Sequence, residues 1–135
     1  MTETLLVLIN ICSSVIDLKN KFFNSNRKKA ISEWLEKIGI NIQSIADSLK
    51  INEYPYQTCS RMTEAYNECY SILGNVVDDN NLEKLNNLLG ESTQIEKIFG
   101  EYSSVKEEEK QGYINQLYTI SGTILGISDT LKYSP

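Results

Sequence analysis

The residue types that most often carry out chemistry in proteins are scarce in this sequence. Its 135 residues include no histidine and three cysteines, Cys12, Cys59 and Cys69. Without an imidazole there is no base for a Ser-His-Asp or Cys-His nucleophile, and histidine-ligated zinc, haem and di-iron sites are excluded. The cysteines are odd in number and lack C-x-x-C spacing, which indicates small buried side chains in a reducing compartment. We therefore expect no catalytic residue, metal or cofactor.

A run of three carboxylates, Glu107–Glu109, is the other candidate for chemistry. Carboxylates perform acid–base catalysis only in a pocket that shifts their pKa values. Negative charge also stabilises the first turn of a helix, because it interacts favourably with the helix dipole. No residue pattern around the run indicates a pocket. We interpret it as a solvated helix start and predict that the protein is not an enzyme.

An apolar segment followed by a basic cluster is the feature that bears most directly on function. Leu5–Ile16 is apolar almost all round a helix, but it is shorter than the ~20 residues that a membrane-spanning helix needs. Beside an anionic leaflet, each cation of a basic cluster contributes about 1 kcal/mol. The same pattern fits a bundle-core helix that ends in a basic turn. The residues predicted to contact lipid are Leu5, Leu6, Leu8, Ile9, Ile11, Lys19, Lys21, Arg27, Lys28 and Lys29.

Two further patterns could form contacts between helices or between molecules. Gly122 and Gly126 have the G-x-x-x-G spacing that lets two helix backbones approach closely, and Thr119 and Thr123 share their face. The glycine pair predicts either a helix contact within the bundle or a surface for self-association. Eight tyrosines suit half-buried positions, either at the edges of a bundle or in an interface.

The spacing of the apolar residues predicts the helices that position these features. Apolar side chains recur at alternating steps of three and four residues, which is the period of one helix face, and no strand-like alternation of useful length occurs. Short connections between such helices predict an all-α, up-and-down bundle of four to five antiparallel helices. We expect a close helix contact at Gly39, a kink at Gly90 and a capping box at Ser104-x-x-Glu107. The predicted helices cover residues 2–23, 27–50, 55–77, 82–102 and 104–132.

Length and composition fit a single globular domain. The chain is 41% hydrophobic and 23% charged, so residues 1–135 can bury one core, with 1–23 as an apolar N-terminal helix and 26–132 as the remaining bundle. The net charge is −5, which makes nucleic acid a poor partner. The N-terminus lacks the basic start and the cleavage site of a secretory signal, which predicts a cytoplasmic protein.

One part of the chain resembles a known family. The likeness is carried by Trp34 within Ile31–Gly39, by the Leu49-Lys50 pair, and by Tyr54-Pro55-Tyr56-x-x-Cys59-x-x-Met62. This pattern is similar to the Bell domains, which are proposed bacterial analogues of the fungal HeLo and animal MLKL-type death domains. The likeness extends over most of the chain, and it is most specific at Trp34 and at Tyr54–Cys59.

The resemblance implies an effector of regulated cell death in antiviral defence, whose N-terminal helix enters the inner membrane after oligomerisation. That role falls on Leu5–Ile16. The implied partners are anionic inner-membrane lipid, further copies of the chain and an upstream signalling protein. An amyloid-type signalling segment often follows such bundles, and none precedes Pro135, so we expect a truncated chain or a different trigger. The alternative is a protein–protein adaptor domain of a signalling or conflict system, with residues 1–23 as ordinary core.

Overall fold

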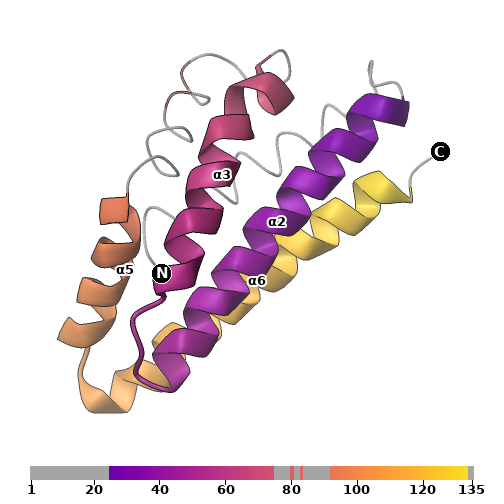
Figure 1. The fold of residues 1–135 in the computed structure, drawn as a ribbon. Helices are drawn as coiled ribbons and strands as arrows, with labels where there is room; N and C mark the ends of the chain where they lie inside the picture. Colours follow the sequence, from indigo (N-terminus) through magenta and orange to yellow (C-terminus); the bar gives the residue numbers. More distant parts are fainter. Residues whose placement is uncertain (1–24, 75–79, 81–82, 84–91, 134–135) are drawn as a thin grey trace.

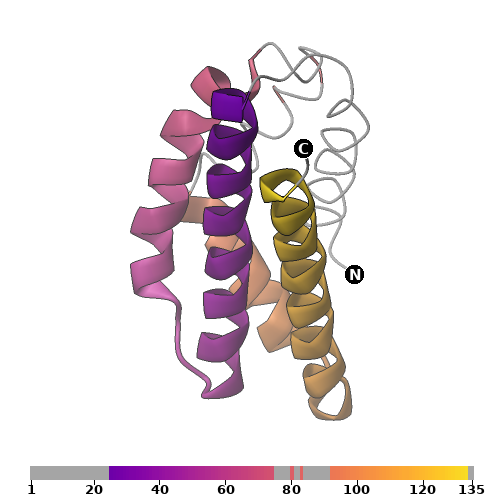
Figure 2. The same cartoon turned by 90° about the vertical axis from the view of Figure 1, so that its right-hand side faces the viewer.

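The computed structural model of the chain describes residues 25–74, 80, 83 and 92–133 (Figure 1). These described residues form helices and turns without any strand, which confirms the predicted all-α class. In both Figure 1 and Figure 2, α2 and α6, which are the longest of the described helices, lie side by side. The elements are α2 (Ser25–Lys50), α3 (Tyr56–Leu73), α5 (Ser92–Ser104), the 3-10 helix η1 (Glu107–Glu109) and α6 (Lys110–Lys132).

Helices α2 and α6 pack closely and run in opposite directions. Ser32, in the first half of α2, contacts Ser128 near the end of α6, whereas Gly39 contacts Ser121 two turns earlier in α6. A Cβ atom placed on Gly39 would lie 2.7 Å from Cγ of Leu125, so α6 approaches this near only because position 39 has no side chain. The close helix contact predicted at Gly39 is confirmed.

The hydrophobic core lies between α2, α3 and α6, and Ile98 and Tyr102 are the side chains that the described part of α5 adds to it. The apolar residues of α2 that recur at steps of three and four, from Ile31 to Leu49, are buried, because this spacing places them on one face of the helix. Met62, Ile72 and Phe99 pack against this core and are partly buried. The buried hydrophobic residues are Ile31, Trp34, Leu35, Ile38, Ile42, Ile45, Ala46, Leu49, Ala65, Leu73, Ile98, Tyr102, Ile114, Leu117, Ile120, Ile124, Ile127 and Leu131.

Several predicted helix ends differ from the observed ones or fall outside the described residues. Helix α3 ends at Leu73 and is followed by a turn at Gly74, so the predicted end near Val77 is wrong. Glycine has a low helix propensity and commonly follows the last helical residue, which accounts for the earlier end. Within the predicted helix 82–102, the structure describes Glu83, which is helical, and the residues from Ser92, where α5 begins. The rest of its first part, the kink at Gly90 and the predicted helix 2–23 lie outside the described residues.

The capping box predicted at Ser104 is also wrong. Ser104 is the last residue of α5, and its hydroxyl donates to the carbonyl oxygen of Gly100, one turn back, at 2.9 Å. A serine in the last turn of a helix readily forms this local bond in place of capping the next helix. Residues Glu107–Glu109 instead form η1, and α6 begins only at Lys110. The three glutamates are exposed, as expected for a solvated cluster.

Replacing Gly39 with alanine tests the close packing of α2 on α6. The new methyl group would overlap Leu125, so we expect the free energy of unfolding to fall by about 1–2 kcal/mol despite the better helix propensity of alanine. Gly122→Ala is the matched control, because nothing lies within 4 Å of its Cβ position, and it should raise that free energy by about 0.5–1 kcal/mol. Urea denaturation followed by circular dichroism measures the free energy of unfolding of both variants. An equal gain in stability from the two substitutions would contradict the close approach of α6 to Gly39.

Candidate functional site

The start of α2 contains the described part of the cluster that was predicted to contact lipid. Lys29 is exposed there, whereas Arg27 and Lys28 are partly buried, and Lys28 also has an interaction partner. Nη2 of Arg27 donates to the carbonyl oxygen of Ile72 at 3.3 Å, in the last turn of α3. Helix C-termini favour a cation because their last carbonyls lack intrahelical donors. Arg27 therefore stabilises the α2–α3 pair. The other predicted positions, 5–21, lie outside the described residues.

Gly122 and Gly126 lie exposed on the outer face of α6. Nothing approaches within 4 Å of a Cβ atom built on either glycine, so neither forms a close contact with another of the described helices. The intramolecular contact expected here is formed by Gly39 instead. Thr119 and Thr123 share this exposed face, and each hydroxyl donates to the carbonyl oxygen four residues earlier at 3.0 Å. Self-association through the glycine pair stays a prediction.

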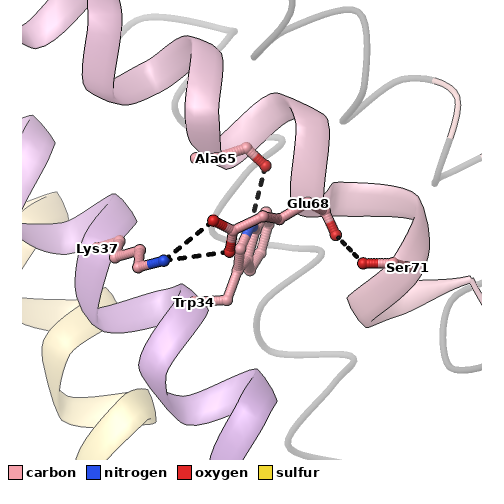
Figure 3. A network of polar contacts seen from close by, with 5 residues as sticks. All are labelled: Trp34, Lys37, Ala65, Glu68 and Ser71. Atoms are coloured by element: carbon pink, nitrogen blue, oxygen red, sulfur yellow. Dashed lines mark hydrogen bonds and ion pairs between the residues drawn. The ribbon is translucent and has the colours of Figure 1, made fainter.

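Trp34, the most specific residue of the resemblance, links α2 to α3 (Figure 3). Its side chain is 1% exposed, and its Nε1–H donates to the carbonyl oxygen of Ala65 at 3.0 Å. On the exposed side of this contact, Nζ of Lys37 lies 3.0 and 3.2 Å from the two carboxylate oxygens of Glu68. A buried indole supplies both apolar area and a directed hydrogen bond, whereas an exposed ion pair contributes little. Trp34 thus has a structural role in the described helices.

The C-terminus of α2 closes in a way that the sequence analysis missed. Asn52 has a φ of 57°, in the left-handed region that asparagine tolerates better than most residues. Its N–H donates to the carbonyl oxygen of Leu49 at 2.9 Å, and the N–H of Glu53 donates to that of Ser48 at 2.8 Å. This pair of bonds is the Schellman motif, which satisfies the last carbonyls of a helix. It ends α2 and turns the chain into the short connection, residues 51–55, that leads to α3.

A cavity of about 360 Å³ lies between the last turns of α2 and the first turns of α3. Pro55 and Thr58 are buried and form its inner wall, whereas Glu53, Tyr56 and Arg61 are exposed. No spacing in the sequence indicated this cavity, since its walls come from two helices that only the fold brings together. The residues that line it are Ser44, Ser48, Glu53, Tyr54, Pro55, Tyr56, Gln57, Thr58 and Arg61.

Two tyrosines of α6 hold carboxylates of other helices. The hydroxyl of Tyr113 donates to Oε2 of Glu101 at 2.9 Å, and Tyr118 donates to Oδ1 of Asp47. Burial raises the pKa of Tyr113, and the hydrogen bond and charge of Glu101 raise it further. The hydrogen bond to Asp47 is the largest cause of the raised pKa of Tyr118. Both hydroxyls are therefore held protonated, which suits a structural role and not a nucleophile or base.

Trp34→Phe tests the contribution of the indole to the α2–α3 contact. Phenylalanine loses the hydrogen bond to Ala65 and part of the buried volume, so we expect the free energy of unfolding to fall by about 1–3 kcal/mol. Lys37→Gln removes the neighbouring exposed ion pair, and it should change that free energy by less than about 0.5 kcal/mol. Urea denaturation followed by circular dichroism measures both variants. Equal losses of stability in Trp34→Phe and Lys37→Gln would show that the Trp34 indole does not stabilise the α2–α3 contact.

The raised pKa of Tyr113 predicts a loss of stability at alkaline pH. In the unfolded chain a tyrosine ionises near pH ~10, whereas the folded protein holds the Tyr113 proton more tightly. This contribution is fully present below pH ~10 and is lost as pH rises toward the folded pKa. Above pH ~10 the free energy of unfolding should therefore fall more steeply in the wild type than in Tyr113→Phe. The exposed Tyr133→Phe control should keep the wild-type slope, and a wild-type slope in Tyr113→Phe would contradict the assignment.

Neither metal ligation nor a membrane span is found in the part of the chain that the structure describes. Its His, Cys, Asp and Glu residues form no group of three or more that could hold a metal ion. None of its helices combines the length and the apolar character needed to cross a membrane. No protein-family model, no curated protein and no solved structure matches the chain. The resemblance to the Bell domains therefore stays a prediction.

Proposed function

We propose that the chain is a membrane-directed effector domain of a bacterial cell-death system, and that Leu5–Ile16 is the segment that enters the lipid. The observation that carries the proposal is this apolar segment followed by a basic cluster, of which Lys29 is exposed at the start of α2. Burial of apolar side chains and attraction to anionic lipid are the two signals that stable peripheral anchoring requires. The likeness to the Bell domains at Trp34 and Tyr54–Cys59 adds support.

The packing of the described helices supports a division between a stable bundle and a releasable N-terminal segment. Helices α2, α3 and α6 bury an apolar cluster among themselves, and buried serine hydroxyls link α2 to α6. In the proposal, residues 1–23 complete an up-and-down bundle of four to five antiparallel helices in the cytoplasm. When an upstream signalling protein clusters several copies, residues 1–23 leave the bundle, bind the inner leaflet and permeabilise it.

An adaptor domain is the second candidate function. Ile51 and Tyr56, at the connection between α2 and α3, are 65% and 76% exposed. Large apolar side chains that gather at one exposed place are typical of a surface that contacts another protein. In this alternative, residues 1–23 are ordinary core and the chain recruits a partner.

Induced expression in bacteria, with a dye that reports membrane potential, tests the effector proposal. The chain is fused to an oligomeriser that forces clustering, and the variant Leu8→Lys places a charge in the apolar segment. We expect clustering of the unmodified chain to depolarise the membrane and arrest growth. Leu8→Lys should abolish both effects while its circular dichroism spectrum stays helical, because a charged side chain is costly to place in lipid.

Ile40→Lys is the matched control for this experiment. Ile40 is 43% exposed on α2, so a lysine there adds the same charge without being buried, and toxicity should persist. A folded Leu8→Lys variant that still kills cells would contradict the effector mechanism. A Leu8→Lys variant that unfolds would favour the adaptor, because a buried unpaired charge destabilises a core by several kcal/mol.

A further inference from the structure

The inner wall of the cavity contains a buried hydroxyl that lacks a partner among the described residues. Thr58 is 3% exposed and lines the cavity, and no described residue forms a hydrogen bond with its side chain. The large majority of buried polar side-chain atoms in folded proteins have a hydrogen-bond partner. Because Thr58 lines the cavity, a group bound there is the partner that this hydroxyl would take.

The N-terminus of α3 directs further donors to the same place. The N–H of Tyr56 donates to the carbonyl oxygen of Tyr54 at 2.9 Å. The N–H groups of Gln57 and Thr58 follow in the first turn, where no earlier turn of the helix supplies an acceptor. That turn contains no acidic residue, so the positive end of the helix dipole is not compensated by its own sequence. Such a terminus favours an anion.

A cation and two hydroxyls complete the set of donors. Arg61 lines the cavity one turn after Gln57, on the same face of α3, and forms no ion pair within the described residues. Ser44 and Ser48 contribute hydroxyls from the opposite wall, on α2. A guanidinium together with backbone N–H groups and hydroxyls matches a phosphoryl group, whose oxygens accept several hydrogen bonds at once.

The size and the remaining lining indicate what the phosphoryl group is attached to. A cavity of about 360 Å³ is in the range of small-molecule sites, so it holds more than a phosphate ion alone. The Glu53 residue also lines the cavity. Its negative charge would repel an inorganic phosphate dianion, and its oxygens could accept hydrogen bonds from hydroxyl or amino groups of a larger ligand. The rings of Tyr54 and Tyr56, with centroids 4.6 Å apart, add apolar surface.

We infer that this cavity binds a small organic phosphate. Its phosphoryl group would lie at the N-terminus of α3, against Thr58 and Arg61, and its hydroxyl or amino groups would face Glu53. The inference concerns residues 44–61 and does not depend on the proposed action at a membrane.

Titration of the full chain with glycerol 3-phosphate, inorganic phosphate or sodium chloride at matched ionic strength tests the inference. Amide ¹H–¹⁵N correlation spectra should show saturable shifts centred on Gln57 and Thr58 with both phosphates. Glycerol 3-phosphate should bind more tightly than inorganic phosphate, because its hydroxyls can reach Glu53. Sodium chloride should produce no saturable shift at these residues.

Substitutions of residues that line the cavity distinguish a specific phosphate site from a general attraction of anions to the protein. Arg61→Gln should weaken phosphate binding about tenfold or more, and Thr58→Val about threefold. Glu53→Gln should instead strengthen the binding of inorganic phosphate, since it removes a repelling carboxylate. Lys50→Gln is the control, because Lys50 is an exposed cation in the last turn of α2 and does not line the cavity.

Three outcomes would overturn the site, provided that circular dichroism shows each variant folded. They are the absence of saturable shifts, an equal weakening in Lys50→Gln, and unchanged binding by the Thr58→Val/Arg61→Gln double variant. Competition by phosphatidic-acid vesicles against glycerol 3-phosphate would assign the phosphoryl group to a lipid headgroup. Failure of those vesicles to compete would assign it to a soluble phosphate.

Discussion

The contact of α6 with α2 at Gly39 is the constraint on which the described packing depends. It brings the helices near enough for Ser32 and Ser128 each to donate to the other's carbonyl oxygen, at 2.9 and 2.7 Å. Ser121 donates in the same way to Gly39, at 2.7 Å. Since each hydroxyl has one proton, the 3.1 Å separation of the Ser32 and Ser128 hydroxyl oxygens is a consequence of this exchange and not a third bond. A shift of α6 along α2 would leave these buried hydroxyls unpaired, so the serines fix the register.

Helix α2 presents different residue sizes to its two neighbours. The small residues Ser32 and Gly39 lie against α6, which lets the backbones approach there, whereas the indole of Trp34 is buried toward α3 and donates a hydrogen bond to Ala65. Closer to the C-terminus of α2, the side chains on the α3 side become small, at Ser44 and Ser48. There the indole has no counterpart, and the cavity of about 360 Å³ lies between the helices. The packed contact at Trp34 and the cavity beside Ser44 and Ser48 thus lie along the same side of one helix, where the side chains change from large to small.

Local periodicity predicted the core but not the partners of each helix. Core positions such as Ile38 and Ile124 could be identified because 3-4 spacing defines one helix face before any tertiary contact forms. The serines that join α2 to α6 could not be identified in this way. A serine among apolar residues only interrupts the apolar pattern, and its role becomes clear once the backbone opposite it is known. Short motifs failed for the same reason. Ser104-x-x-Glu107 fits a helix start, but the preceding helix includes Ser104, and the spacing of Gly122 and Gly126 does not tell on which face they lie. The cavity was missed because its donors belong to two helices.

Arg27 connects the structural and the functional interpretations of the basic cluster. Its guanidinium is charged whether or not it donates to the carbonyl oxygen of Ile72, so it adds to the positive potential at this end of α2 without leaving α3. Lys29 is exposed beside it and can meet an anionic surface directly. An approach of this end of the bundle to lipid therefore requires no break in the contact between α2 and α3. In the effector proposal, the rearrangement is thereby confined to residues 1–23, and the core between α2, α3 and α6 acts as the fixed support from which that segment is released.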